Sequence, residues 1–290
     1  MSIISLLKQQ LKLVSYKAGV VPVPYKAHLA QKRHAVLGAA TARLATYYLN
    51  GTASSLEKAF IEFAIGMWDQ GWSQFSQDKF VLFCLEKQRG GTFVEFGGAD
   101  GLTHSNSALL ESDFGWRGLL LEPNPFEFPL LRRNRVACRA LNAAVKCSDA
   151  DEMELVICGQ LSTVRGFEPV DKHSAARSQA GVVRRVRCVD LNAAIESAGL
   201  GVGTLDYLSV DSEGSELAIL NRFDFGRGPR ILTLECNERV ADEAAIRALM
   251  TKRGYRETLS QHLTEPDLWF VREDVYDSLC HRWSINGLPS

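Results

Sequence analysis

Beyond residue 90 the sequence alternates short apolar runs with stretches of helical periodicity, and this alternation restricts the fold more than any other feature. Strands that alternate with helices of about ten residues indicate βαβ units, in which parallel strands form an open sheet with helices on both faces. The predicted strands cover residues 92–96, 118–121, 136–141, 153–158, 182–189, 206–210, 230–234, 255–260 and 268–272. We therefore predict an α/β fold with a doubly wound, Rossmann-like sheet, closed by two antiparallel strands.

The first 90 residues have a different pattern. Apolar residues at spacings of three and four predict helices over 28–49 and 56–68, and no strand. This part carries a net charge of +6, against −7 for the remainder. We predict an N-terminal helical region, residues 1–75, and a ligand-binding domain, residues 76–290.

The opening segment combines Ile3, Leu7 and Leu11 with Lys8 and Lys12, a basic amphipathic pattern. Such a helix can lie on an anionic membrane surface or against a polyanionic partner, and it can also pack on its own domain or in a dimer. Peripheral membrane contact, acceptor binding and homo-oligomerisation all stay open for this region. We expect no nucleic-acid partner.

Composition places the chain among ordinary globular proteins, with 46% apolar and 23% charged residues. No apolar run approaches the roughly 18 residues that span a bilayer. Seven cysteines occur without a C-x-x-C pair, which is typical of reduced thiols. We expect a cytoplasmic protein, either free or peripheral to the membrane.

In open α/β sheets, ligands bind beyond the carboxyl ends of the strands, near the point where the strand order reverses. The first predicted strand ends in a glycine-rich turn, Gly97 to Gly101, whose G-G-x-x-G spacing differs from the G-x-G-x-x-G dinucleotide fingerprint. The second strand ends in Glu122, which could accept hydrogen bonds from both hydroxyls of a ribose. Either feature alone is weak, because glycine turns and strand-end acids are common. Together they favour a nucleoside-containing cofactor.

The strand at 206–210 ends in Asp211, and three carboxylates fall within the six residues 211–216. Acids favour the positive N-terminus of a helix, and Ser212 or Ser215 could cap the helix that follows. Capping explains Asp211 least well. A cationic ligand explains it better.

Three segments together carry a resemblance to a known family: FVEFGGADGLTHSNSALLE at 93–111, GLLLEPNP at 118–125 and LDYLSVDSEGSELAIL at 205–220. In content and order they resemble the FkbM-type family of S-adenosylmethionine-dependent methyltransferases, over about residues 75–272. The resemblance implies the seven-strand methyltransferase fold and methylation of hydroxyl groups on sugars, glycolipids or natural products.

The resemblance also implies roles for individual residues. Asp211 would face the sulfonium and the acceptor and would be catalytic together with Glu213, while Glu122 would hold the ribose. Gln77 and Asp78 could contact cofactor or substrate, although Asp78 could also cap a helix. The predicted cofactor-binding residues are Gln77, Asp78, Glu95, Gly97, Gly98, Ala99, Asp100, Gly101, Ser105, Asn106, Glu122, Pro123, Asn124, Asn142, Ala143 and Asp211.

Two further features concern the acceptor side. Asp211, Glu235 and Asn237 resemble the acidic set with which catechol-type methyltransferases bind magnesium, and oxygen ligands suit Mg²⁺; Glu235 and Asn237 could instead bind only substrate. The segment 159–181 contains Arg165, Lys172, His173 and Arg177, which could receive phosphates of an acceptor or form a solvated loop.

We therefore expect an S-adenosylmethionine-dependent O-methyltransferase that acts on a hydroxyl of a sugar, glycolipid or polysaccharide precursor. A nicotinamide-dependent oxidoreductase is the main alternative among enzymes, and the glycine spacing and the lack of a plausible Tyr-x-x-x-Lys pair disfavour it. A non-catalytic protein that has kept a nucleoside pocket is the alternative outside enzymes.

Overall fold

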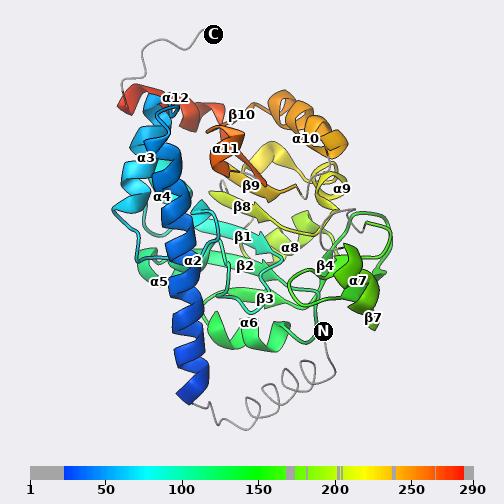
Figure 1. Cartoon of the computed structure of the whole chain (residues 1–290). Coiled ribbons are helices and arrows are strands. Elements are labelled where there is room, and N and C mark those ends of the chain that lie inside the picture. Colours follow the sequence, from blue (N-terminus) through cyan, green and yellow to red (C-terminus); the bar gives the residue numbers. More distant parts are fainter. Residues whose placement is uncertain are drawn as a thin grey trace.

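A computed structural model describes residues 23–167, 174–180, 182–200, 203, 205–236, 240–264 and 266–283. Its centre is a seven-stranded sheet in the order β10-β11-β9-β8-β1-β2-β3 (Figure 1). The strands of this sheet are β1 (Thr92–Phe96), β2 (Arg117–Leu121), β3 (Arg139–Leu141), β8 (Tyr207–Val210), β9 (Ile231–Glu235), β10 (Tyr255–Glu257) and β11 (Asp267–Arg272). The predicted doubly wound α/β sheet is confirmed.

The strand order places a topological switch point at β1. This strand pairs in parallel with β2 on one side and with β8 on the other, so that Phe96 lies level with both Leu121 and Val210. From β1 the chain moves outward through β2 and β3, and then returns to β8. A crevice therefore forms beyond the carboxyl ends of β1 and β8.

The closing strands are antiparallel, as predicted: β11 pairs with β9 and β10 pairs with β11. This pairing sets Asp267, at the start of β11, opposite Glu235, at the end of β9. Two acidic side chains from distant parts of the sequence thus reach the same edge of the sheet.

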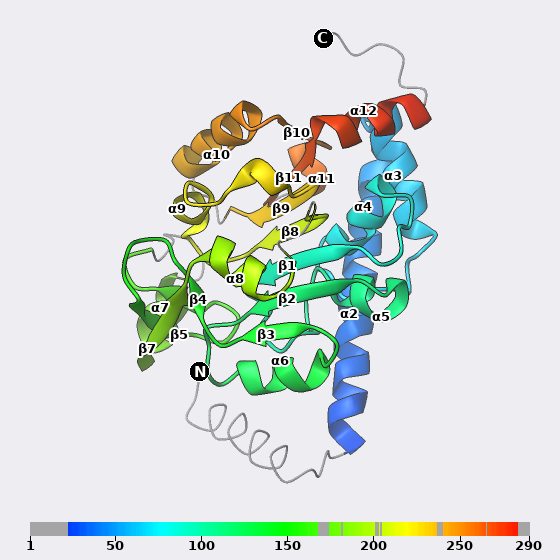
Figure 2. The same ribbon diagram turned by 180° about the vertical axis from the view of Figure 1, so that it is seen from behind.

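Two of the predicted strands lie outside the main sheet. They correspond to β5 (Glu152–Ile157) and β7 (Val182–Val189), which pair antiparallel in a second sheet with the short strands β4 (Ala144–Val145) and β6 (Thr163–Val164). Exposed arginines alternate with buried residues along β7, a pattern that suits a sheet with one face in solvent. Figure 2 shows this smaller sheet beside the carboxyl ends of the main strands.

Helices cover both faces of the main sheet. One face packs against α8 (Leu191–Ser197), α9 (Glu216–Leu220) and α10 (Val240–Lys252). The other packs against α4 (Gln77–Cys84), α5 (Ala108–Phe114), α6 (Phe128–Asn134) and α12 (Glu273–Arg282). The remaining helical elements are α7 (Ser174–Ala180), the 3₁₀ turn at Phe225–Arg227 and α11 (Gln261–Thr264).

The N-terminal helices α2 (Val23–Leu49) and α3 (Ser55–Ile65) complete the second face. A capping box between Ser54 and Glu57 starts α3, which buries Phe60. The Phe60 ring lies 6.0 Å from that of Trp269 in β11. Figures 1 and 2 show α2 and α8 on opposite faces of the sheet. The N-terminal helices thus belong to the same hydrophobic core as the sheet, and the division at residue 75 stays a prediction.

The described part of the N-terminal region contains no strand, as predicted. The basic amphipathic segment before residue 23 lies outside the described residues. No described helix combines the length and the apolar character that a bilayer crossing requires.

Candidate active site

Two turns meet at the carboxyl ends of β1 and β8. Gly97, directly after β1, has a positive φ of 81°, and a Cβ atom added there would lie 2.2 Å from the backbone oxygen of Asp211. An L side chain would be strained by the dihedral angle and excluded by the contact. Gly97 is therefore the residue that lets the two turns approach each other.

Glu122 follows β2 and is buried next to these turns. Its Oε2 accepts a hydrogen bond from the Ala99 N–H at 2.8 Å, and its Oε1 accepts one from the Asn124 N–H at 2.7 Å. Burial raises the pKa of Glu122 to about 8, and the two N–H groups oppose that rise. A small cavity of about 50 Å³ opens here between Glu122, Ala99, Pro123 and Ala143.

A larger cavity, of about 310 Å³, lies beyond the ends of β1, β8 and β9. The two cavities adjoin, because both are lined by Phe96, Gly97, Gln160, Asp211 and Glu213. The wall of the larger cavity also contains residues from just before α4, from the turn after β1 and from β9 and β11, namely Gln74, Phe75, Gln77, His104, Asn106, Thr233, Glu235 and Asp267.

Three carboxylates converge on this cavity. Each of Asp211, Glu213 and Glu235 places an oxygen within 4.8 Å of the others. Burial raises the pKa of Asp211 well above its ordinary value, and the charges of Glu235 and Glu213 raise it further. Among the described residues, Asp211 Oδ1 is buried and has no hydrogen-bond partner. Such an atom has lost its water without gaining a donor from the protein.

Burial also raises the pKa values of the other acids in the cavity wall. The pKa of Glu235 rises to about 7, and the negative charge of Asp267 adds to the effect. The pKa of Asp267 rises to about 7, although hydrogen bonds from Gln77 and Trp269 oppose the shift. The wall of the larger cavity therefore holds several buried acids whose pKa values are raised, a pattern that is frequent at functional sites.

Glu213 is held from the second sheet and from α7. Its Oε2 accepts from Arg177 at 2.9 Å in a buried ion pair, and its backbone oxygen accepts from Thr163 Oγ1 at 2.7 Å. Arg177 is thus committed to the protein, and Arg165 forms an exposed ion pair with Glu154 at 2.6 Å. Within segment 159–181, Arg177 is thus held inside the protein, whereas Arg165 lies at the surface. Lys172 and His173 lie outside the described residues.

Glu216 stabilises the turn after β8. Its Oε1 accepts from the Ser212 N–H and the Gly214 N–H, both at 3.0 Å, and from Ser212 Oγ at 2.9 Å. Neither Ser212 nor Ser215 caps α9 through its side chain, so the capping role considered from sequence passes to a carboxylate. Of the three acids in the D-S-E-G-S-E segment, Asp211 is the one with a buried oxygen that has no hydrogen-bond partner among the described residues.

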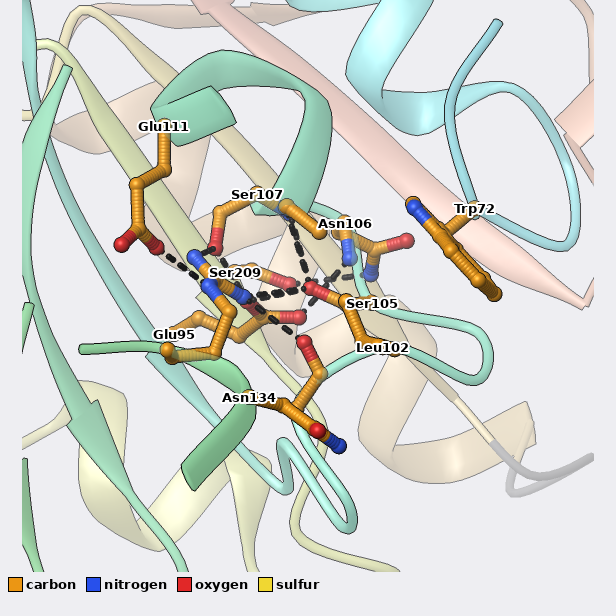
Figure 3. A network of polar contacts seen from close by, with 12 residues as sticks. Trp72, Glu95, Leu102, Ser105, Asn106, Ser107, Glu111, Asn134 and Ser209 are labelled. Atoms are coloured by element: carbon orange, nitrogen blue, oxygen red, sulfur yellow. Dashed lines mark hydrogen bonds and ion pairs between the residues drawn. The ribbon is translucent and has the colours of Figure 1, made fainter. Parts of the chain in front are cut away.

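A polar network fixes the turn after β1 (Figure 3). The Glu95 carboxylate accepts from the Asn106 N–H at 2.8 Å, from Ser105 Oγ at 3.0 Å and from the Ser107 hydroxyl. Arg135, after α6, lies 3.7 Å from Glu95 and donates to the Gly101 backbone oxygen at 3.0 Å. Glu95 lines the cavity, yet its carboxylate accepts its hydrogen bonds from residues of the turn itself.

Local hydrogen bonds delay the start of the helix that follows the turn after β1. The observed helix, α5, begins only at Ala108. Before it, Asp100 Oδ1 accepts from the Leu102 N–H at 2.9 Å and from the Thr103 N–H at 2.7 Å. Local side-chain bonds of this kind compete with helix formation.

Most of the predicted cofactor residues lie in the walls of the two cavities. These are Gln77, Glu95, Gly97, Gly98, Ala99, Ser105, Asn106, Glu122, Pro123, Ala143 and Asp211. The structure places the others behind the walls, where they hold loops: Asp78, Asp100, Gly101, Asn124 and Asn142.

Two of these supporting residues illustrate their role. Asp78 is fully buried in the first turn of α4, and accepts from the Trp72 N–H at 3.2 Å and from the Ser73 hydroxyl. Asn142 donates to the Glu122 backbone oxygen at 2.7 Å, which ties the end of β3 to the end of β2. Asn237, the third predicted metal ligand, lies outside the described residues.

Sequence reasoning missed Asp267 and Arg135. Asp267 receives a hydrogen bond from Gln77 Nε2 at 2.7 Å, which links the first residue of α4 to the first residue of β11. Its only sequence signal is its place at the start of the last strand, where the antiparallel register brings it opposite Glu235. Arg135 carries no recognisable signal, because it follows a helix and acts through tertiary contacts alone.

Comparison with known families agrees with this geometry. Residues 95–257, more than half of the chain, match the Methyltransferase FkbM domain. The chain belongs to this family of S-adenosylmethionine-dependent methyltransferases, as its motifs predicted. No curated protein matches the chain.

Several solved methyltransferase structures are similar to the chain at low identity. The precorrin-6y C5,15-methyltransferase from Geobacter metallireducens is 13% identical, with a TM-score of 0.34 over 63% of this chain and 73% of that one. The METTL16 MTase domain is 10% identical, with a TM-score of 0.39 over 67% of this chain and 64% of that one. The mitomycin 7-O-methyltransferase MmcR is 15% identical, with a TM-score of 0.31 over 81% of this chain and 67% of that one.

Proposed function

We propose that the protein is an O-methyltransferase that transfers the methyl group of S-adenosylmethionine to a hydroxyl of a sugar, glycolipid or polysaccharide precursor. One observation carries the proposal. The small cavity at Glu122, suited to a nucleoside, opens directly onto a larger polar cavity, and Asp211 with its unpartnered Oδ1 stands at the junction.

The residues of the small cavity fit the cofactor. Glu122 keeps lone pairs free beyond its two backbone bonds, so that it can accept from ribose hydroxyls. Ala99, Pro123 and Ala143 offer small apolar walls for a flat base. When bound, S-adenosylmethionine supplies a methyl carbon that its positively charged sulfur has already activated.

We assign Asp211 as the general base that removes the proton of the acceptor hydroxyl. A hydroxyl becomes a good nucleophile only as its proton leaves, and a positioned base contributes about 10² to 10⁴ in rate. The raised pKa of Asp211 makes its ionised form a stronger base than an exposed aspartate. Its Oδ1 has no hydrogen-bond partner among the described residues, so it can accept a proton from the acceptor hydroxyl, while Gly97 lets the turn that carries Asp211 lie against the turn after β1.

The other walls of the larger cavity support a hydroxylated acceptor. The polar residues Gln160, Thr233, Asn106 and Gln77 line the space. Oriented donors and acceptors of this kind favour a polyol over an apolar ligand, because each buried polar group needs a partner. Alignment of the acceptor and exclusion of water then provide most of the remaining rate enhancement.

Magnesium is a second candidate cofactor, because oxygens of Asp211, Glu213 and Glu235 lie within 4.8 Å of one another. A metal there would lower the pKa of the acceptor hydroxyl. Turnover that is unaffected by EDTA would exclude this role, and turnover that returns only with added Mg²⁺ would establish it.

The test of the proposed function begins with ligand binding. We expect S-adenosylhomocysteine, but not NAD, to bind in isothermal titration. The protein is then incubated with S-adenosylmethionine and a panel of glycans and lipid-linked sugars, and mass spectrometry should detect a gain of one methyl group on oxygen. Binding of NAD would favour the oxidoreductase alternative, and cofactor binding without turnover on any acceptor would favour the non-catalytic one.

The setting of the protein in the cell belongs to the same proposal. We place it in the cytoplasm, where S-adenosylmethionine and sugar precursors are both available to it. Peripheral membrane contact and homo-oligomerisation through the N-terminal region stay predictions, to be checked by vesicle sedimentation and by light scattering.

A further inference from the structure

The charged groups that line the larger cavity are almost all of one sign. Five carboxylates face it, those of Glu95, Asp211, Glu213, Glu235 and Asp267, and no lysine or arginine lines it among the described residues. His104 is the remaining titratable group in the wall, and burial lowers its pKa, which favours the neutral imidazole. Such a cavity repels phosphate and carboxylate groups and attracts cations.

Two of the five carboxylates already have cationic partners in the protein. Glu95 faces Arg135 at 3.7 Å, and Glu213 faces Arg177 at 2.9 Å. The described residues form no ion pair with Asp211, Glu235 or Asp267; Asp267 is bonded only to the neutral donors Gln77 and Trp269, at 2.7 and 3.3 Å. Glu235 shares a hydrogen bond with Asp211, and the charge of Arg43 acts on Asp267. The acids that have no ion-pair partner among the described residues therefore lie at the carboxyl ends of β8 and β9 and at the start of β11.

Hydrogen-bond acceptors without donors point to the same space. Among the described side chains, only Ser76 Oγ, Asn106 Oδ1 and Asp211 Oδ1 are buried without a partner. Asn106 and Asp211 both line the larger cavity, whereas Ser76 does not. A ligand that fills this cavity must therefore bring donors, and the carboxylates favour donors that carry positive charge.

The cofactor accounts for only part of this demand. The residues that would hold it, Glu122 and Gly97, follow β2 and β1, and Asp211 after β8 would face its sulfonium charge. Glu235 and Asp267 stand on β9 and β11, one and two strands farther from β1. Both acids line the larger cavity, where a ligand cation could pair with them.

A metal ion fits this edge of the sheet less well than an ammonium group. The Arg177 guanidinium is already paired with Glu213, one of the three clustered carboxylates, and it would repel a dication nearby. Mg²⁺ also requires near-octahedral oxygen ligation, whereas Gln77 holds Asp267 in a hydrogen bond. An ammonium group needs only two or three acceptors and can lie between carboxylates on neighbouring strands.

We propose that the acceptor is an amino sugar or a related amino polyol, whose protonated amine binds between Glu235 and Asp267 while the hydroxyl to be methylated faces Asp211. This inference rests on the proposed function and narrows its substrate class. It excludes acceptors with a phosphate or carboxylate beside the reacting hydroxyl.

Matched pairs of sugars test the inference in the full chain, saturated with S-adenosylhomocysteine at pH 7 in the presence of EDTA. Isothermal titration compares D-glucosamine with N-acetyl-D-glucosamine, and D-galactosamine with N-acetyl-D-galactosamine. Each pair differs in the charge of the nitrogen and keeps the ring hydroxyls. We expect each free amine to bind at least about tenfold more tightly than its acetylated partner, as removal of a buried charge interaction implies.

Variants then assign the preference to the two acids. Glu235→Gln and Asp267→Asn should each reduce amine affinity about fivefold or more, with little change for the acetylated sugars and for S-adenosylhomocysteine. Asp277→Asn, a matched change at an exposed position of α12 outside both cavities, should leave the preference intact.

The outcomes separate the two proposals. Failure of S-adenosylhomocysteine to bind would overturn the proposed function together with this inference. Normal S-adenosylhomocysteine binding with equal affinities within each pair, or with no binding of either sugar, would overturn the inference alone. The inference would also be overturned if Mg²⁺, added in place of EDTA, bound at one ion per chain and displaced the amine.

Discussion

The two sides of the candidate active site treat their buried acids in opposite ways. At the end of β1, the Glu95 carboxylate accepts from two serine hydroxyls and a backbone N–H and faces Arg135. At the ends of β9 and β11, Glu235 and Asp267 stand level with each other without an ion pair among the described residues. The difference teaches that a buried acid with a cationic partner fixes structure, whereas a buried acid without one is available to a ligand.

Replacement of the base should produce the largest effect on the unsatisfied side. Asp211→Asn keeps the shape of the side chain but removes its basicity, so turnover with S-adenosylmethionine should fall by about 10² to 10⁴. The circular dichroism spectrum and the affinity for S-adenosylhomocysteine serve as controls and should change little. Turnover close to that of the parent protein would remove Asp211 from the chemistry.

Removal of the cation should produce the largest effect on the satisfied side. Arg135→Met leaves Glu95 and Glu111 buried without their shared partner, and the loss of one member of a buried ion pair costs about 3–5 kcal/mol. The free energy of unfolding, measured with urea, should fall by that amount.

An exposed ion pair provides the matched control for this change. Arg165→Met breaks the exposed pair with Glu154 and should change the free energy of unfolding by less than about 1 kcal/mol. Equal effects of the two substitutions would mean that the Arg135 network does not hold the turn after β1.

The pH dependence of stability gives the smallest and most discriminating test. The folded-state pKa of Glu235 is raised to about 7 from an ordinary 4.5, so between these pH values the folded protein binds more protons than the unfolded chain. Its contribution is therefore fully present below pH 4.5 and is lost as the pH rises through 7. Glu235→Gln should reduce this loss in the free energy of unfolding by about 1 kcal/mol, which is less than the full pKa shift of Glu235 would give.

Urea unfolding at pH 5 and at pH 7.5 measures the effect. The parent protein should lose more stability than Glu235→Gln between the two values. Asp267, whose pKa is also raised to about 7, should contribute with the same sign, so Asp267→Asn should flatten the profile as well. A parent profile that rises over this interval would show that both acids are compensated in solution.

Much of the fold follows from local patterns. The apolar run at 92–96 and its glycine turn predict β1 and its carboxyl end, and Glu122 is found where the second strand predicts it. Strands fully buried between layers read as continuous apolar runs, and such runs are easy to recognise. The division into two sheets cannot be predicted in this way, because the sequence patterns of β5 and β7 do not show which strands they pair with.

The site divides in the same way. Residues on the turns directly after β1, β2 and β8 could be predicted, because a strand end fixes where its first residues point. Asp267 and Arg135 could not, because Asp267 reaches the cavity through antiparallel pairing, and Arg135 holds the turn after β1 through tertiary ion pairs. The ion pair between Arg177 and Glu213 could not be predicted either, because it joins α7 to the turn after β8 through the tertiary fold.

The short segment that leads into α4 has a further consequence. Gln74, Phe75 and Gln77 line the larger cavity, and a few residues later Phe80 packs against Trp269, with ring centres 4.8 Å apart. Selectivity and folding thus depend on one stretch of chain. A relative that evolves a different acceptor preference by reshaping this wall must at the same time keep the aromatic packing beneath it. New specificities should therefore arise more readily at Gln160, which lines the cavity from the segment between β5 and β6.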